Sequence, residues 1–329
     1  MKKFINQVEL VEDQMIQGMV KAYPQYVRKL DCGNVVVRTE KKEGKVALIS
    51  GGGSGHEPAH GGYVGTGMLD AAVAGAVFTS PTPDQIYEGI KAIATDKGVL
   101  MVIKNYTGDV MNFEMAGEMA QMDDIKVAQV VVDDDVAVDG SLYTVGRRGV
   151  AGTVFVHKIA GAKAEEGAEL EEVQRVAQKV IDNVRTMGVA IRPCTVPAAG
   201  KPGFELGEDE MEVGIGIHGE PGTHKELLRP ADEIVDHILD KILSDIDYTG
   251  HEVAVMVNSS GATPLMELFI INNHVADVLA AKGIRVYKTF VGEYMTSLEM
   301  EGFSVSLLRL DDEMKALLDA HADTIAFKA

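Results

Sequence analysis

Short apolar runs alternate along the chain with longer amphipathic stretches, a pattern typical of strands that are connected through helices. Several runs are continuous in Val, Ile and Met, as strands buried on both faces of a parallel sheet require. The predicted strands are Lys45–Ser50, Val99–Lys104, Ile125–Val132, Val189–Val196, Met211–Ile217, Val253–Asn258 and Ile284–Val291. The pattern therefore predicts an α/β protein.

Two predicted helices have clear end signals. The segment Pro83–Thr95 follows Thr82, which can cap it, begins with proline and is followed by Gly98. A second helix is predicted over Glu169–Met187, ending before a glycine.

The chain length and a change in composition predict two domains. A chain of 329 residues is long enough for roughly two domains with separate cores. The stretch Pro193–Gly207 is rich in Pro, Gly and Ala and separates two parts of comparable length. We place the break between Met187 and Gly188, which gives an N-terminal α/β domain of residues 1–187 and a C-terminal α/β domain of residues 188–329. Each is expected to have a mostly parallel or mixed central sheet flanked by helices, and the last strand and helix are compatible with packing on either domain.

Charge and cysteine content narrow the classes of function. The chain has 31 Lys and Arg against 50 Asp and Glu, a net charge of −19, which disfavours binding to nucleic acid or to an anionic membrane. Cys32 and Cys194 are far apart and provide neither a disulfide framework nor a thiolate metal site. Acidic residues interrupt the N-terminal stretch before any apolar run long enough for a signal sequence. We therefore expect a soluble cytoplasmic protein.

Three loops that follow predicted strands carry the chemically reactive side chains. Ligands of open α/β sheets bind at the carboxyl ends of the strands. The loop 51–62 contains six glycines and His56, so its backbone amides can approach a small polar ligand. The second loop places Lys104 at a strand end and Asp109 at a helix start, and the third holds His218 next to glycine. These groups are expected to converge on one cleft.

Each of these residues also has a plainer structural interpretation. Six glycines exceed what one tight turn needs, although a turn is the simple alternative. His56 and His218 can be ordinary loop histidines, but the glycines beside both favour a function. Asp109 taken alone is more simply a carboxylate that stabilises a helix N-terminus, and Lys104 can extend from its strand end into water.

One motif matches a zinc site only in its letters. His56 to His60 fits H-E-x-x-H, which binds zinc when both imidazoles share one face of a continuous helix. Pro58 is expected to open a helix, which would leave His56 before it and His60 inside it. We therefore expect no metal site here. The glycine-rich loop also lacks the G-x-G-x-x-G and G-K-[ST] patterns, so no self-sufficient nucleotide site is expected.

Two charged runs are interpreted as surface features. The acidic run 133–135 is expected to be a solvated turn, with a divalent-cation site as the alternative. Arg147 and Arg148 are expected to be an exposed pair, with a phosphate or an acidic partner as the alternative ligand.

The segments that carry this chemistry resemble those of a known family. They are GGGSGHEPAHGGYVGTGMLDAAVAGAVFTSPTPDQI from Gly51 to Ile86, KNYTGDVMNFEMA from Lys104 to Ala116, and GIGIHGEPG from Gly214 to Gly222. On these segments, and with a likeness that covers nearly the whole chain, the sequence resembles the substrate-binding subunit of dihydroxyacetone kinase.

The resemblance implies roles for individual residues. It implies that His218 forms a covalent hemiaminal with the carbonyl carbon of dihydroxyacetone, while His56 and Asp109 act on the hydroxyl that is phosphorylated. Asp109 is the candidate to accept the hydroxyl proton, with His56 hydrogen-bonded to the substrate and sharing the acid/base work. The substrate-binding residues that the resemblance implies are Gly53, Ser54, Gly55, His56, Lys104, Asp109 and His218.

The resemblance also implies partners. ATP-dependent kinases of this type carry a second, nucleotide-binding region and are much longer, so this chain is expected to be the separate subunit of the phosphoenolpyruvate-dependent system. The nucleotide, ADP or ATP, and magnesium are then expected on a partner L subunit that the phosphotransferase subunit recharges, with no cofactor bound by this chain. A homodimer is expected from the resemblance alone.

Two rival functions stay open. One is a non-catalytic paralogue that senses dihydroxyacetone and coactivates a regulator; the presence of Asp109, which a sensor does not need, favours the enzyme. The other, more distant, is a metal-dependent hydrolase built on His56 and His60.

Overall fold

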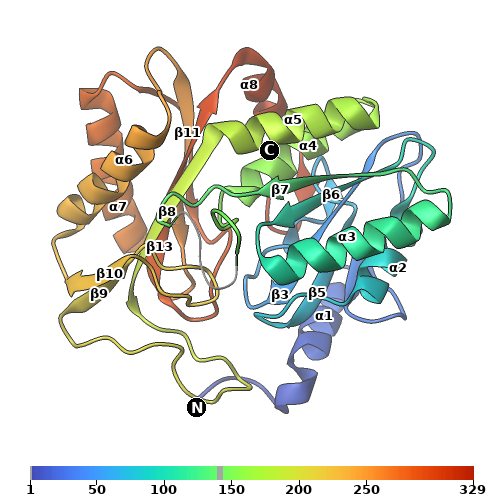
Figure 1. Cartoon of the computed structure of the whole chain (residues 1–329), viewed down its shortest axis with the longest axis horizontal. Helices are drawn as coiled ribbons and strands as arrows, with labels where there is room; N and C mark the ends of the chain where they lie inside the picture. Colours follow the sequence, from blue (N-terminus) through green and yellow to red (C-terminus); the bar gives the residue numbers. More distant parts are fainter. Residues whose placement is uncertain (1, 139–143) are drawn as a thin grey trace.

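Two six-stranded sheets stand next to each other with helices between and outside them (Figure 1). The computed structural model describes residues 2–138 and 144–329. The helices are α1 (Val11–Ala22), α2 (Pro83–Ile93), α3 (Thr107–Met122), α4 (Thr153–Glu165), α5 (Leu170–Asn183), α6 (Ala231–Asp245), α7 (Leu265–Ala281) and α8 (Asp312–Asp319), with 3-10 turns η1 (Val8–Leu10) and η2 (Gly61–Tyr63). This arrangement confirms the predicted α/β class.

The first sheet contains the buried parallel strands that the apolar runs predicted. Its order is β1-β2-β5-β3-β6-β7, where β5, β3, β6 and β7 pair in parallel, while β2 pairs antiparallel with both β5 and β1. The strands are β1 (Val27–Lys29), β2 (Val35–Arg38), β3 (Ala47–Ser54), β5 (Ala71–Val77), β6 (Val99–Lys104) and β7 (Val127–Val132). Alternate residues face opposite sides, so Ile49 packs towards α2 and α3 while Leu48 packs towards α4 and α5.

The second sheet is mixed and largely antiparallel. Its order is β10-β9-β8-β13-β11-β12, and within it only β11 and β12 run parallel. The strands are β8 (Val184–Arg192), β9 (Glu210–Val213), β10 (His224–Leu227), β11 (Glu252–Ser259), β12 (Arg285–Gly292) and β13 (Glu301–Leu310). Helices α6 and α7 cover one face, while the other face shares a core with α4, α5 and α8.

The C-terminal segment packs on the first half of the chain. Strand β14 (Asp323–Thr324) pairs with β4 (Gly65–Thr66), and α8 lies against α4. Phe327 is buried in the same core as Leu48 and Leu100 of the first sheet. The described residues contain no helix that is both long and apolar enough to cross a membrane.

Some element boundaries differ from the prediction. The helix predicted to reach Met187 ends at Asn183, and β8 begins at Val184, because this segment pairs with β13 along most of its length. The same strand ends at Arg192 rather than Val196. The expected domain break between Met187 and Gly188 therefore falls inside β8, a strand that belongs to the second sheet.

Candidate functional site

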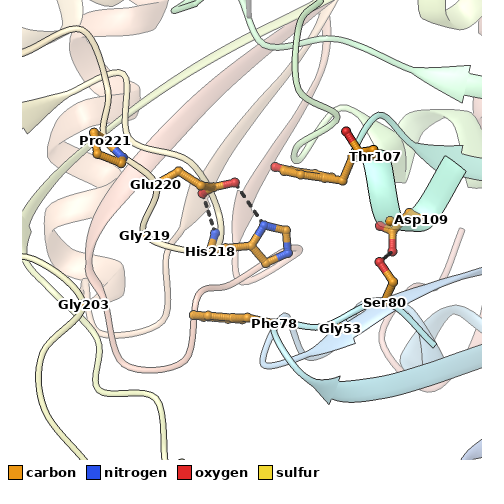
Figure 2. A pocket seen from close by; sticks show the side chains of 12 residues that line it. Gly53, Phe78, Ser80, Thr107, Asp109, Gly203, His218, Gly219, Glu220 and Pro221 are labelled. Atoms are coloured by element: carbon orange, nitrogen blue, oxygen red, sulfur yellow. Dashed lines mark hydrogen bonds and ion pairs between the residues drawn. The ribbon is translucent and has the colours of Figure 1, made fainter. Parts of the chain in front are cut away.

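The site lies at the point where the strand order of the first sheet reverses. From β3 the chain moves to β5 on one side and then to β6 on the other, and such a reversal leaves a crevice at the carboxyl ends of the strands. Gly53, Phe78 and Tyr106, which come from the ends of these three strands, line a cavity of about 570 Å³. Figure 2 shows this cavity with Gly53 and Phe78 labelled. The loop 218–221 of the second half closes its other side.

His218 projects its imidazole into this cavity (Figure 2). Its Nδ1 lies 3.0 Å from Oε1 of Glu220, and its backbone N–H donates to Oε2 of the same carboxylate at 2.8 Å. An ionised carboxylate only accepts hydrogen bonds, so Nδ1 carries a proton, and in the neutral ring Nε2 keeps a free lone pair. The ring is therefore oriented and has one nucleophilic nitrogen, and the side chain is 16% exposed.

Aromatic rings surround His218 edge-on. The ring centroids of Tyr106, His56 and Phe78 lie 4.5, 4.8 and 5.3 Å from that of the imidazole. Edge-to-face contacts of this kind favour one ring orientation. Together with the Glu220 carboxylate they hold His218 in place over the cavity.

His56 is a second histidine beside it, and it is fully buried. Its Nδ1 donates to the carbonyl of Thr296 at 2.8 Å, so Nε2 is an acceptor, and that buried nitrogen has no hydrogen-bond partner among the described residues. Burial, and then the nearby His218 and Lys104, lower the pKa of His56 well below its usual value of 6.5. A buried acceptor without a partner is costly, which makes it a natural contact for a bound hydroxyl.

Asp109 is a buried carboxylate in the first turn of α3. Its Oδ2 lies 3.3 Å from Nζ of Lys104, and the hydroxyl of Ser80 donates to Oδ1 (Figure 2). Gly52 makes this arrangement possible, because a Cβ at that position would lie 2.4 Å from Nζ of Lys104. The carboxylate is thus held by one cation and one hydroxyl at the edge of the cavity.

The predicted site residues are brought together, with two exceptions. Gly53, Asp109 and His218 line the cavity, while His56 contacts the ring of His218 and Lys104 contacts Asp109.

The exceptions are the other two residues of the glycine-rich loop. The hydroxyl of Ser54 donates to the carbonyl of Gly75 at 2.7 Å, and the N–H of Gly55 donates to the carboxylate of Glu57. Both groups stabilise the loop, and neither residue lines the cavity.

Several residues of the site were not predicted. Tyr106 and Glu220 are within the segments that carried the resemblance, and Glu220 stands two residues after His218, the separation that lets a carboxylate reach back to the ring. Phe78 and Ser80 also lie within these segments, but they follow β5, a strand of Ala, Gly and Val whose pattern gave no strong signal.

His56 and His60, whose spacing matches a zinc motif, do not share a helix in the structure. His60 is not inside a helix, as had been expected, because Pro58 lies in a turn and His60 precedes the 3-10 turn η2. Its buried Nδ1 lies 2.9 Å from Nε2 of His157. Within residues 2–138 and 144–329, no group of three or more His, Cys, Asp or Glu could hold a metal ion.

Two charged runs expected at the surface are largely buried. Asp134 accepts the backbone N–H groups of Val150 and Gly152, and Asp135 pairs with the buried guanidinium of Arg148. The prediction of a solvated turn was wrong for these two residues because the loop that follows supplies their partners. Arg147 instead binds Asp245 near the surface.

The chain is similar to a known protein family over most of its length. Residues 17–326 match the Dak1 domain. The chain is 56% identical over 329 residues to a protein of Listeria innocua serovar 6a named PTS-dependent dihydroxyacetone kinase 1, dihydroxyacetone-binding subunit DhaK, with 99% of this chain and 100% of that protein covered.

Two solved structures are similar over nearly the whole chain. The dihydroxyacetone kinase from C. freundii in complex with AMP-PNP and Mg2+ matches with a TM-score of 0.93 at 35% identity, covering 99% of this chain but 61% of that one. The dihydroxyacetone kinase operon co-activator Dha-DhaQ matches with a TM-score of 0.89 at 37% identity, covering 95% of this chain and 97% of that one.

Proposed function

Because the chain belongs to the Dak1 family, we propose that it is the dihydroxyacetone-binding subunit of a phosphoenolpyruvate-dependent dihydroxyacetone kinase. The observation that carries the proposal is the free Nε2 of His218, which is oriented by Glu220 over a cavity that also exposes Asp109. A nucleophile and a potential base at one small cavity suit a substrate with a carbonyl next to a hydroxyl.

His218 binds the ketone covalently in this proposal. Nε2 adds to the carbonyl carbon, a C–N bond forms, and the π pair moves to the oxygen, which takes up a proton. The ring nitrogen Nδ1 gives up its proton in turn, so the neutral adduct contains every atom of both reactants and needs no oxidant or leaving group. The bond compensates for the small surface of a three-carbon substrate, and it excludes glycerol, which has no carbonyl.

Asp109 accepts the proton of the hydroxyl that is phosphorylated, and His56 accepts a hydrogen bond through its free Nε2. Lys104 holds the Asp109 carboxylate from behind. Gly53 contributes backbone at the cavity wall, while Ser54 and Gly55 brace the loop. The phosphoryl donor, ADP or ATP with magnesium, is on a partner L subunit recharged by the phosphotransferase subunit, so this chain supplies the aligned acceptor.

Reconstitution tests this function. The purified chain, its nucleotide-bearing partner, a phosphoryl donor and dihydroxyacetone should together yield dihydroxyacetone phosphate, and omission of this chain should abolish it. A second candidate is a sensor of dihydroxyacetone, favoured by the likeness to a co-activator structure. Adduct formation without any turnover would support the sensor and overturn the kinase subunit.

The proposal extends to assembly and organisation. We propose a homodimer, and the neighbouring Leu265, Met266, Phe269 and Ile270 on α7, each at least half exposed, are the apolar surface that best suits it. Light scattering should give twice the monomer mass.

We place the division between the two α/β parts at Asn183 and Val184, so that the first part supplies the acid/base pair and the second supplies the imidazole. The cytoplasm, where the free thiols of Cys32 and Cys194 stay reduced, is the proposed location.

A further inference from the structure

Behind the loop that carries His218 lies a buried ion pair that the proposed reaction does not use. Arg148 and Asp135 are 0% and 2% exposed. The Nε atom of Arg148 donates to Oδ2 of Asp135 at 2.7 Å, and a terminal nitrogen donates to the carbonyl of Gly214 at 2.6 Å. These bonds fix the guanidinium against the start of the segment 214–222.

The guanidinium fixed in this way faces the carboxylate that orients His218. A Cβ built on Gly216 would lie 2.0 Å from Oε2 of Glu220 and 2.8 Å from a terminal nitrogen of Arg148, so both groups flank the same point. Glycine at this position lets them approach. Asp135, Arg148 and Glu220 thus form a series of alternating charge that ends next to the imidazole of His218.

The series has a clear electrostatic effect on Glu220. Burial opposes ionisation of this carboxyl group, but a positive charge on His218, the hydrogen bond from its ring and the guanidinium of Arg148 outweigh it and lower the pKa of Glu220 to about 2. When the ring is neutral, Arg148 is the cation that remains close to the carboxylate. An ionised carboxylate accepts from Nδ1 of His218, so that in the neutral ring Nε2 is the unprotonated nitrogen. A protonated carboxyl would instead donate to Nδ1, which forces the neutral ring to carry its proton on Nε2 and removes the lone pair.

We propose that the buried Asp135–Arg148 pair is a positioning device that keeps Glu220 ionised and thereby keeps His218 in the tautomer whose Nε2 is nucleophilic. Neither residue of the pair touches the cavity, so both act through Glu220. Asp135 orients the guanidinium and balances its charge, because a buried arginine without a carboxylate would be costly. The inference rests on the proposed covalent role of His218 for its functional meaning, but the tautomer itself is measurable without substrate.

The test is 15N NMR of histidine-labelled protein without ligand. The chain has nine histidines, and the His218→Ala variant identifies the relevant signals by their loss. Wild-type protein should show His218 protonated at Nδ1. The double variant Asp135→Asn/Arg148→Gln, which removes both charges and keeps polar groups, should shift His218 towards the Nε2-protonated form and slow adduct formation roughly 10- to 100-fold.

Arg147→Gln is the matched control, because Arg147 stands next to Arg148 in the sequence but pairs with Asp245 outside the site, and this variant should behave as wild type. If the double variant does not fold, Arg148→Lys serves in its place, because it preserves the positive charge but not the planar guanidinium. We expect this variant to shift the His218 tautomer partly and to form the adduct at an intermediate rate. An unchanged tautomer in a folded variant of either kind overturns the inference. Absence of any adduct in wild-type protein would instead overturn the proposed function and leave the tautomer result standing.

Discussion

His218 and His56 show how one residue type acquires a defined protonation state from its hydrogen bonds. In both residues Nδ1 faces an acceptor, the carboxylate of Glu220 in one case and the carbonyl of Thr296 in the other. Both rings therefore offer Nε2 as an acceptor or nucleophile. The two rings differ in the charge of the acceptor. The ionised carboxylate of Glu220 stabilises the cationic ring that develops during addition, whereas the neutral carbonyl of Thr296 does so less.

Substitution of His218 and Asp109 should separate binding from transfer. We expect His218→Ala to abolish the mass increase of a trapped dihydroxyacetone adduct, because among the described residues His218 is the histidine that lines the cavity. Asp109→Ala should retain the adduct and lose phosphoryl transfer by a factor of about 100 or more. Mass spectrometry and a coupled turnover assay measure the two effects. Asp123→Ala, just past the other end of α3, is the control, and parent-rate turnover by Asp109→Ala would refute its role as base.

Gly52 provides a second test at the residue scale. Its φ of 153° and the nearby Lys104 ammonium leave no room for a side chain, so Gly52→Ala should displace Lys104 from Asp109. We expect turnover to fall at least about tenfold, since misplaced catalytic groups lose rate steeply. Gly18→Ala in α1, where nothing lies within 4 Å of the new methyl group, should leave activity intact and raise helix stability by up to about 1 kcal/mol. Unchanged turnover in Gly52→Ala would contradict this account of the glycine run.

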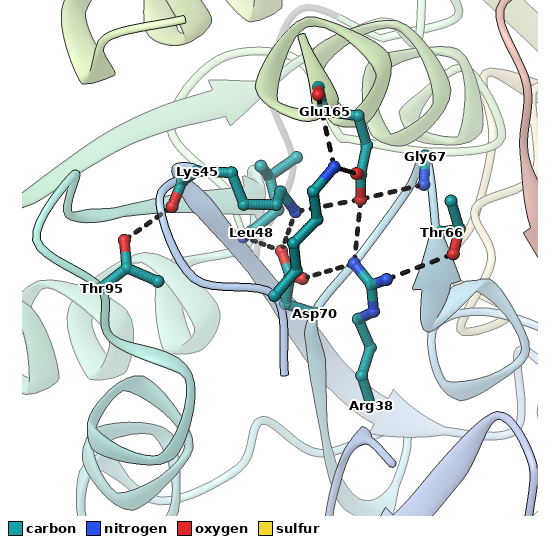
Figure 3. A network of polar contacts seen from close by, with 9 residues as sticks. Arg38, Lys45, Leu48, Thr66, Gly67, Asp70, Thr95 and Glu165 are labelled. Atoms are coloured by element: carbon teal, nitrogen blue, oxygen red, sulfur yellow. Dashed lines mark hydrogen bonds and ion pairs between the residues drawn. The ribbon is translucent and has the colours of Figure 1, made fainter. Parts of the chain in front are cut away.

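Helix α4 shows at the element scale how the middle layer is held. It is buried along most of its length, and Nζ of its Lys158 donates to the carbonyl of Leu317 at 2.6 Å. At its C-terminal end Glu165 joins a network with Arg38, Lys45 and Asp70 (Figure 3). The network connects the helix to β2, β3 and the start of β5, the strands that precede the site.

The network predicts how stability depends on pH. Burial works against ionisation of Glu165, but Lys45, Lys42 and Arg38 together lower its pKa from 4.5 to about 2. The ionised form therefore stabilises the fold above about pH 4.5, and this contribution is lost as the pH falls from 4.5 towards 2.

Urea unfolding of Glu165→Gln measures the effect. At pH 7 the variant should be less stable than wild type by about 1 to 3 kcal/mol, and the difference should shrink as the pH falls below about 4. Glu166→Gln is the neighbouring control and should cost less, because its carboxylate is more exposed. A difference that stays constant with pH would contradict the assignment.

The helices and strands also show which parts of the fold could be predicted from the sequence pattern. Strand β6 and the start of α2 were predicted at their observed limits, because continuous apolar residues and a proline at the first helical position are local signals. Strand β5 was missed because Ala and Gly acquire their strand conformation from pairing with β3. The burial of Asp135 and Arg148 was missed for a similar reason, since each is neutralised by a residue that only the fold brings close.

At the scale of the whole molecule the two halves build the site together. Thr296 of the second half accepts from His56 of the first, and the N–H of Leu298 donates to the carbonyl of Gly55 at 2.7 Å. The N–H of Ala326 donates to the carbonyl of Gly62 at 2.9 Å. Loops from both halves therefore order one another, and we expect the chain to unfold as one cooperative unit.

Phe327 tests this coupling. Its ring lies 5.5 Å from that of Phe290, in a core shared by both halves. Phe327→Ala should lower the free energy of unfolding by about 3 kcal/mol, with coincident transitions by far-UV circular dichroism and tyrosine fluorescence. The exposed Phe4→Ala should have little effect. Two separate transitions in wild-type protein would show instead that the halves fold independently.

A crystal soaked with dihydroxyacetone tests the central claim most directly. We expect continuous electron density from Nε2 of His218 to the central carbon of the ligand, with Nδ1 still next to the carboxyl group of Glu220 and a terminal hydroxyl next to Asp109. Ligand density that is separate from the imidazole, or a bond formed through Nδ1, would contradict the account.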